Sequence, residues 1–153
     1  MYIRRIAALL VLVPAALWAA DPFVGTWKLN VAKSHYTTGT PPKEQTLTIS
    51  ESGGDQDTTV SLTTADGNTI TYRFTAPAKG GDGKVVQPGG GFDAVHLNRI
   101  KANTRETHFS KSGKMVRTAR ITVNKDGKTM HGTIKGTDAQ GKPIAATVVF
   151  EKQ

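Results

Sequence analysis

The chain of 153 residues contains no cysteine. No disulfide can therefore hold the fold, no thiolate can act as a nucleophile or metal ligand, and stability has to come from a hydrophobic core. Apolar residues also lack a helical period, which argues against helices. Tryptophan is scarce: Trp18 lies in an apolar leader, and Trp27 is the only tryptophan beyond it.

Signatures of catalysis are missing as well. The sequence has no Ser/His/Asp signature, no H-E-x-x-H and no paired carboxylates on one short element. The glycine-rich stretch 77–93 is not a phosphate loop, because Val85 stands where that motif needs serine or threonine. We expect no cofactor and no metal, and we expect His96 and His131 to face solvent by strand alternation. The sequence therefore favours a non-enzymatic protein.

The first twenty residues predict a signal peptide. Arg4 and Arg5 precede an apolar run from 6 to 20, which is short for a membrane span of about 20 residues and typical of a secretory leader. We expect cleavage near Ala20, export to a bacterial periplasm or the outside, and no transmembrane span in the mature chain. An uncleaved anchor is the alternative. Residues 21–153 then form one domain, large enough to bury a core.

Charge is unevenly distributed along the domain. Residues 94–153 carry twelve lysines and arginines against four acidic residues, whereas residues 21–93 are slightly acidic. The basic half could contact an anionic surface. Proteins that bind nucleic acid usually add exposed aromatics for stacking. Here most of the aromatics fall on inward registers, namely Trp27, Tyr72, Phe74, Phe109 and Phe150, so this criterion argues against nucleic acid as a partner.

Alternation of apolar and polar residues predicts an all-β fold. The expected strands follow an opening strand that contains Trp27 and Leu29, and they are 44–51, 58–64, 69–76, 94–101, 104–110, 115–124, 129–135 and 144–151, with a weaker one at 84–87. Short connectors with glycine or asparagine make neighbours in sequence neighbours in space. We therefore predict an antiparallel up-and-down meander of about nine or ten strands, closed into a barrel. A two-sheet β-sandwich is the alternative. The stretches 31–43 and 77–93 are expected at a barrel rim.

The opening residues 23–29, which read FVGTWKL, resemble the first strand of the calycin barrels, the lipocalins and fatty-acid-binding proteins. In those families a Gly-x-Trp opens the barrel, so the resemblance gives Gly25 and Trp27 a structural role and implies a calycin-like barrel. The chain also resembles small secreted bacterial proteins of unknown function that begin DPFxGTWKLN, a resemblance that brings no activity.

Departures from the calycin pattern limit what can be carried over. The connector 31–43 is too short for the two-helix lid of fatty-acid-binding proteins, and the last strand lacks their Arg-x-Tyr. No arginine follows Arg120, although lipocalins pack one over the tryptophan. The resemblance supports the barrel and transfers no binding site.

Two arginines are the candidate anion anchors. Arg117 shares a register with Met115, Ala119, Ile121 and Val123. Arg99 shares one with Val95 and Leu97, so both arginines would point inward. A buried arginine needs a partner, and few acids lie on inward registers, so an anionic ligand could supply it. The alternatives are that each arginine reaches water at a strand end or that a bulge shifts the register.

These observations give three hypotheses for function. The first is an exported carrier of a small apolar or amphiphilic ligand that can be anionic, bound by Arg117, Arg99, Tyr72, Phe74, Phe109, Leu62 and Met115. The second is a self-filled structural or interaction barrel with a basic contact surface. The third is an enzyme of lipocalin-like fold, for which Tyr72 is the inward phenol. Cavity volume separates the first two hypotheses.

Overall fold

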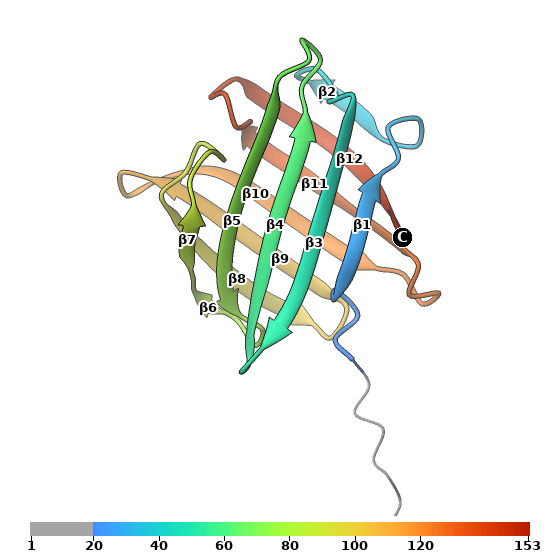
Figure 1. The fold of residues 1–153 in the computed structure, drawn as a ribbon, viewed down its shortest axis with the longest axis vertical. Helices are drawn as coiled ribbons and strands as arrows, with labels where there is room; N and C mark the ends of the chain where they lie inside the picture. The colour runs from blue at the N-terminus through green and yellow to red at the C-terminus, as the bar shows by residue number, and fades with distance from the viewer. Residues whose placement is uncertain (1–19) are drawn as a thin grey trace, which may run out of the picture.

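The computed structural model describes residues 20–153, so the expected leader lies outside the described residues except for Ala20. The described part is built from β-strands joined by turns and loops (Figure 1). It contains no helix long and apolar enough to cross a membrane. The strands are β1 Gly25–Leu29, β2 His35–Thr38, β3 Glu44–Ser52, β4 Asp55–Thr63, β5 Thr69–Pro77, β6 Gly81–Asp82, β7 Lys84–Gln87, β8 Ala94–Lys101, β9 Thr104–Lys111, β10 Lys114–Val123, β11 Thr129–Thr137 and β12 Pro143–Lys152.

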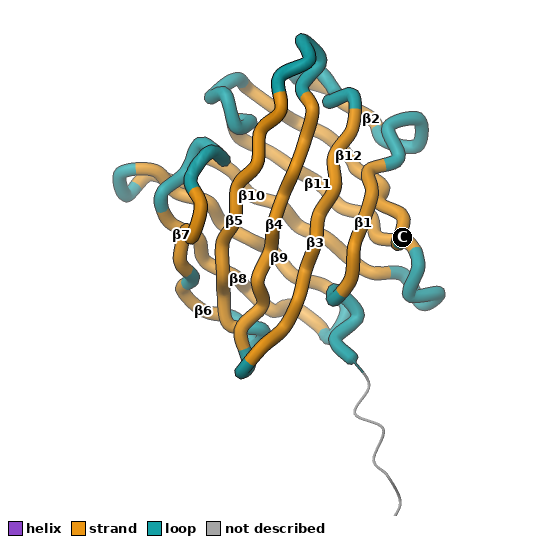
Figure 2. Tube along the Cα trace, viewed as in Figure 1, coloured by secondary structure: helices purple, strands orange, loops and turns teal. Residues whose placement is uncertain are grey.

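All of these strands belong to one antiparallel sheet that curls into a nearly closed barrel (Figure 2). The order around the sheet is β6-β8-β9-β10-β11-β12-β1-β3-β4-β5-β7, so most neighbours in space are neighbours in sequence. Pairing of β12 with β1 joins the two ends of the chain, with Leu29 opposite Phe150. The predicted meander and barrel are confirmed, and the single continuous sheet replaces the sandwich alternative.

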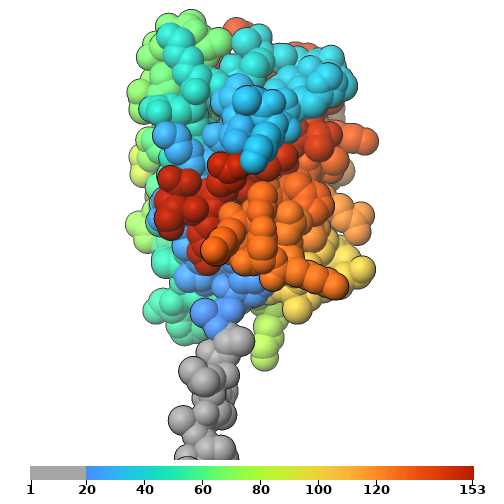
Figure 3. All heavy atoms as spheres, turned by 90° about the vertical axis from the view of Figure 1, so that its right-hand side faces the viewer, coloured from blue at the N-terminus to red at the C-terminus, as the bar shows by residue number. Residues whose placement is uncertain are grey.

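The connector 31–43 contains a strand that was not predicted. Residues 35–38 form β2, which pairs with β12 on the edge away from β11, with Tyr36 opposite Ala146. On the same edge β1 pairs with the end of β12. Figure 3 shows the blue and cyan atoms of the first strands lying against the red atoms of β12. The four residues of β2 do not alternate between buried and exposed side chains, because only Tyr36 is partly buried. The remainder of this connector reaches the open end of the barrel.

The glycine-rich stretch 77–93 does not lie only at a rim, as expected, but runs along the wall. Its strand β6 pairs with β8. Its strand β7 coincides with the weaker strand expected at 84–87 and pairs with β5. The stretch thereby fills the seam between β5 and β8 (Figure 1). Phe92, near the end of the stretch, is buried, with its ring centroid 5.4 Å from that of Tyr72.

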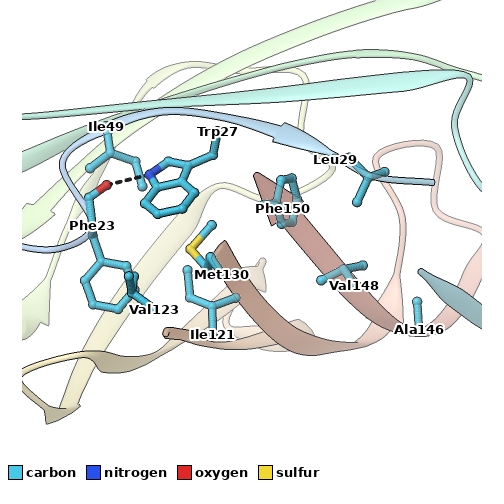
Figure 4. Close-up of a cluster of buried hydrophobic side chains, with 10 residues drawn as sticks. All are labelled: Phe23, Trp27, Leu29, Ile49, Ile121, Val123, Met130, Ala146, Val148 and Phe150. Carbon is cyan, nitrogen blue, oxygen red and sulfur yellow. Dashed lines mark hydrogen bonds between the residues drawn. The ribbon is translucent and has the colours of Figure 1, made fainter. Parts of the chain in front are cut away.

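Strand alternation places two apolar clusters inside the barrel. The first includes Trp27, Met130 and Phe150 and extends along β1, β11 and β12 (Figure 4). The second lies on the β4, β5, β8 and β9 side, where Tyr72, Phe74, Val95 and Phe109 surround Phe92. The aromatic side chains expected on inward registers are all buried, which confirms those register assignments: Trp27, Tyr72, Phe74, Phe109 and Phe150.

Trp27 closes one end of the barrel, which we call the base. Its indole Nε1 donates a hydrogen bond of 2.9 Å to the backbone oxygen of Phe23 (Figure 4), and the amine of Lys152 lies 5.3 Å from the ring centroid. Lys152 on the last strand thus supplies a cation over the tryptophan. Gly25 has a φ of 139°, a conformation that favours glycine, and a Cβ there would meet Lys152. This arrangement is compatible with a calycin-like fold.

Met115 was expected on the inward face of β10, and this expectation is wrong. The pairing of β10 with β9 shifts register between Met115 and Arg117, and the Met115 side chain is 59% exposed. The bulge affects only the start of the strand. Arg117, Ile121 and Val123 are buried as their alternation predicts.

Candidate functional site

A pocket opens at the end of the barrel opposite Trp27, where the loop after β2 meets the β4–β5 and β11–β12 turns. This mouth pocket has a volume of about 240 Å³. Its walls are largely apolar, with Leu62, Ile70, Ile134 and Ile144 among the lining side chains. Charged residues at its edge are Asp66, Asp138 and Lys142. An apolar hollow with a few polar groups is typical of a small-molecule site.

A second, smaller space lies deeper in the barrel, between the two apolar clusters. This inner cavity has a volume of about 70 Å³ and shares Gln45 and Ile134 with the lining of the mouth pocket. A water molecule takes up about 30 Å³ in the liquid, so the inner cavity has room for a compact group and not for a chain. The barrel is therefore largely filled by its own side chains below the mouth.

The residues predicted to bind ligand fall into three places. Leu62 lines the mouth pocket. Four of them line the inner cavity: Tyr72, Phe74, Phe109 and Arg117. Arg99 and Met115 line neither space, Met115 because of the bulge and Arg99 because it lies at the base.

Arg117 is buried and is held by backbone oxygens. Its Nε donates to Thr137 O at 2.6 Å, and its Nη2 donates to Gly90 O. The guanidinium also lies over the rings of Phe92 and Phe109, with its carbon 5.6 Å and 5.2 Å from their centroids. Arg117 therefore connects the stretch 77–93 to the end of β11. It makes no ion pair within the described residues.

Arg99 has a carboxylate partner of its own chain. Its Nη2 lies 2.8 Å from Oδ2 of Asp21, and its guanidinium carbon is 5.0 Å from the Phe23 ring centroid. Further bonds go to the backbone oxygens of Ala78, Lys101 and Ala102. These contacts place Arg99 in the closure of the base.

A third arginine, Arg105, was not singled out from the sequence and is the most buried of the three, at 2% exposure. Its Nη1 donates to Oε1 of Gln56 at 2.7 Å, whereas its Nε has no hydrogen-bond partner. Burial, together with the neighbouring Arg99, lowers the pKa of Arg105 to about 10, with Asp21 acting in the opposite direction. The guanidinium still carries its charge at neutral pH, and it lines the inner cavity.

A signal for Arg105 was present in the sequence. Arg105, Thr107 and Phe109 alternate along β9 and share one face, so an inward Phe109 implies an inward Arg105. The apolar patterning of this strand is weak, because threonine and arginine hold the other inward positions. On β10 the inward face is more apolar, so Arg117 is easier to recognise there as an inward charge.

The titratable side chains that line the inner cavity are Tyr72, Arg105 and Arg117. The inner cavity is lined by no aspartate, glutamate or histidine. Burial raises the pKa of Tyr72, although the nearby charge and hydrogen bond of Arg117 lower it in part. Burial also raises the pKa of Tyr36, which lines the mouth pocket. Both phenols are therefore protonated at neutral pH and can donate hydrogen bonds.

Histidines lie outside these spaces. His96 and His108 are opposite each other on β8 and β9, with ring centroids 6.5 Å apart, and each has a carboxylate oxygen 2.6 Å away, from Asp82 and Glu106 respectively. His131 is exposed, as expected. Within residues 20–153, no three histidine or acidic side chains are grouped so that they could hold a metal ion.

Comparison with known proteins adds no assignment: no family model matches the sequence, and no curated protein matches it.

Proposed function

We propose that the chain is an exported, non-enzymatic binding protein for a small apolar or amphiphilic molecule, and that the ligand lies in the mouth pocket. The observation that carries the proposal is the apolar hollow at the open end of a barrel whose other end Trp27 closes. Its volume of about 240 Å³ is just below the range of about 300–1,000 Å³ common for ligand sites, so the ligand is small.

The polar edge of the mouth pocket supports an amphiphile over a pure hydrocarbon. Lys142 lies on the β11–β12 turn, and Asp66 lies on the β4–β5 turn. The hydrogen bond from Thr64 is the largest of the effects that lower the pKa of Asp66, and the charge of Lys142 lowers it further. Polar groups at such an edge orient a ligand, while apolar walls supply most of its affinity.

The test is a titration with N-phenyl-1-naphthylamine, a neutral apolar dye whose fluorescence rises in apolar surroundings. The variant Ala65→Phe places a ring at the mouth pocket, since Ala65 lies in the β4–β5 turn and lines it. The matched control is Ala102→Phe, in the exposed turn between β8 and β9 at the base.

We expect saturable binding of one dye per chain, at least tenfold weaker in Ala65→Phe and unchanged in Ala102→Phe. Circular dichroism checks that both variants keep the strand signal. Failure of the wild type to bind the dye, or equal affinity in all three proteins, contradicts the proposal. The second hypothesis, a self-filled barrel that acts through its basic surface, would then be favoured by the small inner volume.

A further inference from the structure

We propose that the inner cavity is an anion subsite, in which Arg105 binds one carboxylate-sized group at the lower end of the barrel interior. The inference deepens the proposed function, because the group can be the head of a ligand whose apolar part lies in the mouth pocket. It can equally be a separate small carboxylate, and the experiment below distinguishes the two sources.

The first argument is an incomplete set of hydrogen bonds. Arg105 has Gln56 as its one hydrogen-bond partner among the described residues, and its Nε is buried with none. Burying a charge without compensation is costly, and each unmade hydrogen bond of a charged donor adds to the cost. The chain compensates the charge in part, because the guanidinium carbon lies 4.7 Å from the Phe23 ring centroid and Asp21 favours the charged form. The missing hydrogen bonds are what a group in the inner cavity can supply.

The second argument is charge. Arg105 and Arg117 both line the inner cavity, and no acidic side chain does. The nearest candidate, Asp21, is already bound by Arg99 at 2.8 Å. The cavity wall is thus cationic within an otherwise apolar interior, where a low effective dielectric strengthens the attraction for an anion.

The third argument is shape. A guanidinium binds a carboxylate through two parallel N–H groups, and Arg73 does so on the surface with its Nε and Nη2 toward Asp57. Arg105 uses Nη1 for Gln56, so the corresponding Nε–Nη2 edge has no hydrogen bond among the described residues, and Nε itself is fully buried. Thr58 and Thr107 add two hydroxyls to the cavity lining.

The fourth argument is size. At about 70 Å³, the inner cavity holds roughly the volume of two water molecules at about 30 Å³ each. A carboxylate with one or two carbons matches this volume. A longer chain fits only if it continues into the mouth pocket, with which the cavity shares Gln45 and Ile134.

The experiment measures thermal unfolding of the purified chain in low-chloride buffer at fixed ionic strength. The probes are acetate, propionate and butyrate as free small carboxylates, decanoate as a carboxylate with a long apolar part, and decanol as its neutral counterpart. Wild type is compared with Arg105→Met, which keeps length and removes the charge. The matched control is Arg120→Met, on the exposed face of β10.

We expect carboxylates to raise the unfolding temperature of the wild type and of Arg120→Met by several degrees, and to leave Arg105→Met unchanged. A response to acetate or propionate identifies a separate small anion. A response to decanoate alone, without decanol, identifies a ligand head group. Without any carboxylate, Arg105→Met should be at least as stable as the wild type, because it removes a buried charge whose hydrogen bonds are incomplete.

If Arg105→Met fails to fold, Arg105→Lys provides the same test, because it keeps the charge and loses the planar fork, and carboxylate affinity should fall at least tenfold. The inference is overturned if no carboxylate stabilises the wild type, or if Arg105→Met responds as the wild type does. The dye titration reports on the mouth pocket separately. Dye binding that Ala65→Phe weakens, without any carboxylate response, leaves the proposed function standing and removes only the anion subsite.

Discussion

Trp27 donates its indole hydrogen bond to the backbone oxygen of Phe23 at 2.9 Å, and neither side chain is exposed. The Gly-x-Trp at the start of the domain is thereby explained: Gly25 bends the chain, and the indole, fixed at its nitrogen, seals the base of the barrel. The same position keeps Trp27 out of the lining of the mouth pocket and the inner cavity.

The first prediction concerns this closure. Trp27→Phe should lower the free energy of unfolding by about 2–4 kcal/mol, because it leaves a cavity and removes the partner of the Phe23 oxygen. Urea unfolding followed by circular dichroism measures the change. Dye binding at the distant mouth pocket should persist in the folded variant. A loss below about 1 kcal/mol would show that the indole is not a principal closure of the base.

A second prediction concerns Arg117, which bonds to Gly90 O and Thr137 O. Replacing it with methionine leaves both oxygens without this donor, so the segment that fills the seam should loosen. Hydrogen exchange of a peptide covering residues 88–93 should become at least several-fold faster. Arg120→Met is the matched control. Equal exchange rates in the two variants would contradict the role of Arg117 in holding residues 88–93.

The third prediction tests the register of the interior. Phe109→Ala should cost about 3–5 kcal/mol of stability, since Phe109 is buried against Phe74 and Phe92. Met115 lies on the neighbouring strand β10, just before the register shift, and is exposed. Met115→Ser should therefore change the free energy of unfolding by no more than about 0.5 kcal/mol. Chemical unfolding of the two variants in parallel checks both values. A large loss in Met115→Ser would place Met115 inside after all.

A fourth prediction concerns acid stability. The hydrogen bond from Arg73 holds the pKa of Asp57 below its usual value of 3.8. The ionised pair therefore stabilises the fold above about pH 4, and this contribution is lost as the pH falls through the lower folded pKa. The stability difference between wild type and Asp57→Asn should shrink between pH 5 and about pH 2 in urea titrations. Arg73→Gln should show the same trend, and a pH-independent difference would contradict this account.

The strands were predictable because the cue is local. In segments such as 69–76 and 94–101, apolar and polar residues alternate and short turns follow, so both the strand and its inward face are defined by neighbours in sequence. The strand β2 was missed, because its pairing with Ala146 on β12 depends on a contact over more than 100 residues. The path of residues 77–93 likewise depends on the tertiary structure, because these residues fill the gap between β5 and β8, which do not pair with each other.

The candidate site was predictable only in part. Alternation identified Tyr72, Phe74, Phe109 and Arg117 on the inner cavity, as residues of strands with a clear pattern. A one-residue bulge, invisible in the sequence, moved Met115 to the surface. The mouth pocket is completed by residues of loops and turns, such as Thr40 and Ala139. Their positions depend on how the barrel closes and not on any local pattern.

The central claim, that the barrel binds a small molecule at its mouth, is tested most directly by native mass spectrometry of the chain purified without detergent. The wild type and Ala102→Phe should each carry one small organic molecule per chain, or take up one equivalent of decanoate or of N-phenyl-1-naphthylamine when offered. Ala65→Phe should remain empty under the same conditions. A wild type that is purified empty and takes up neither compound would contradict the account.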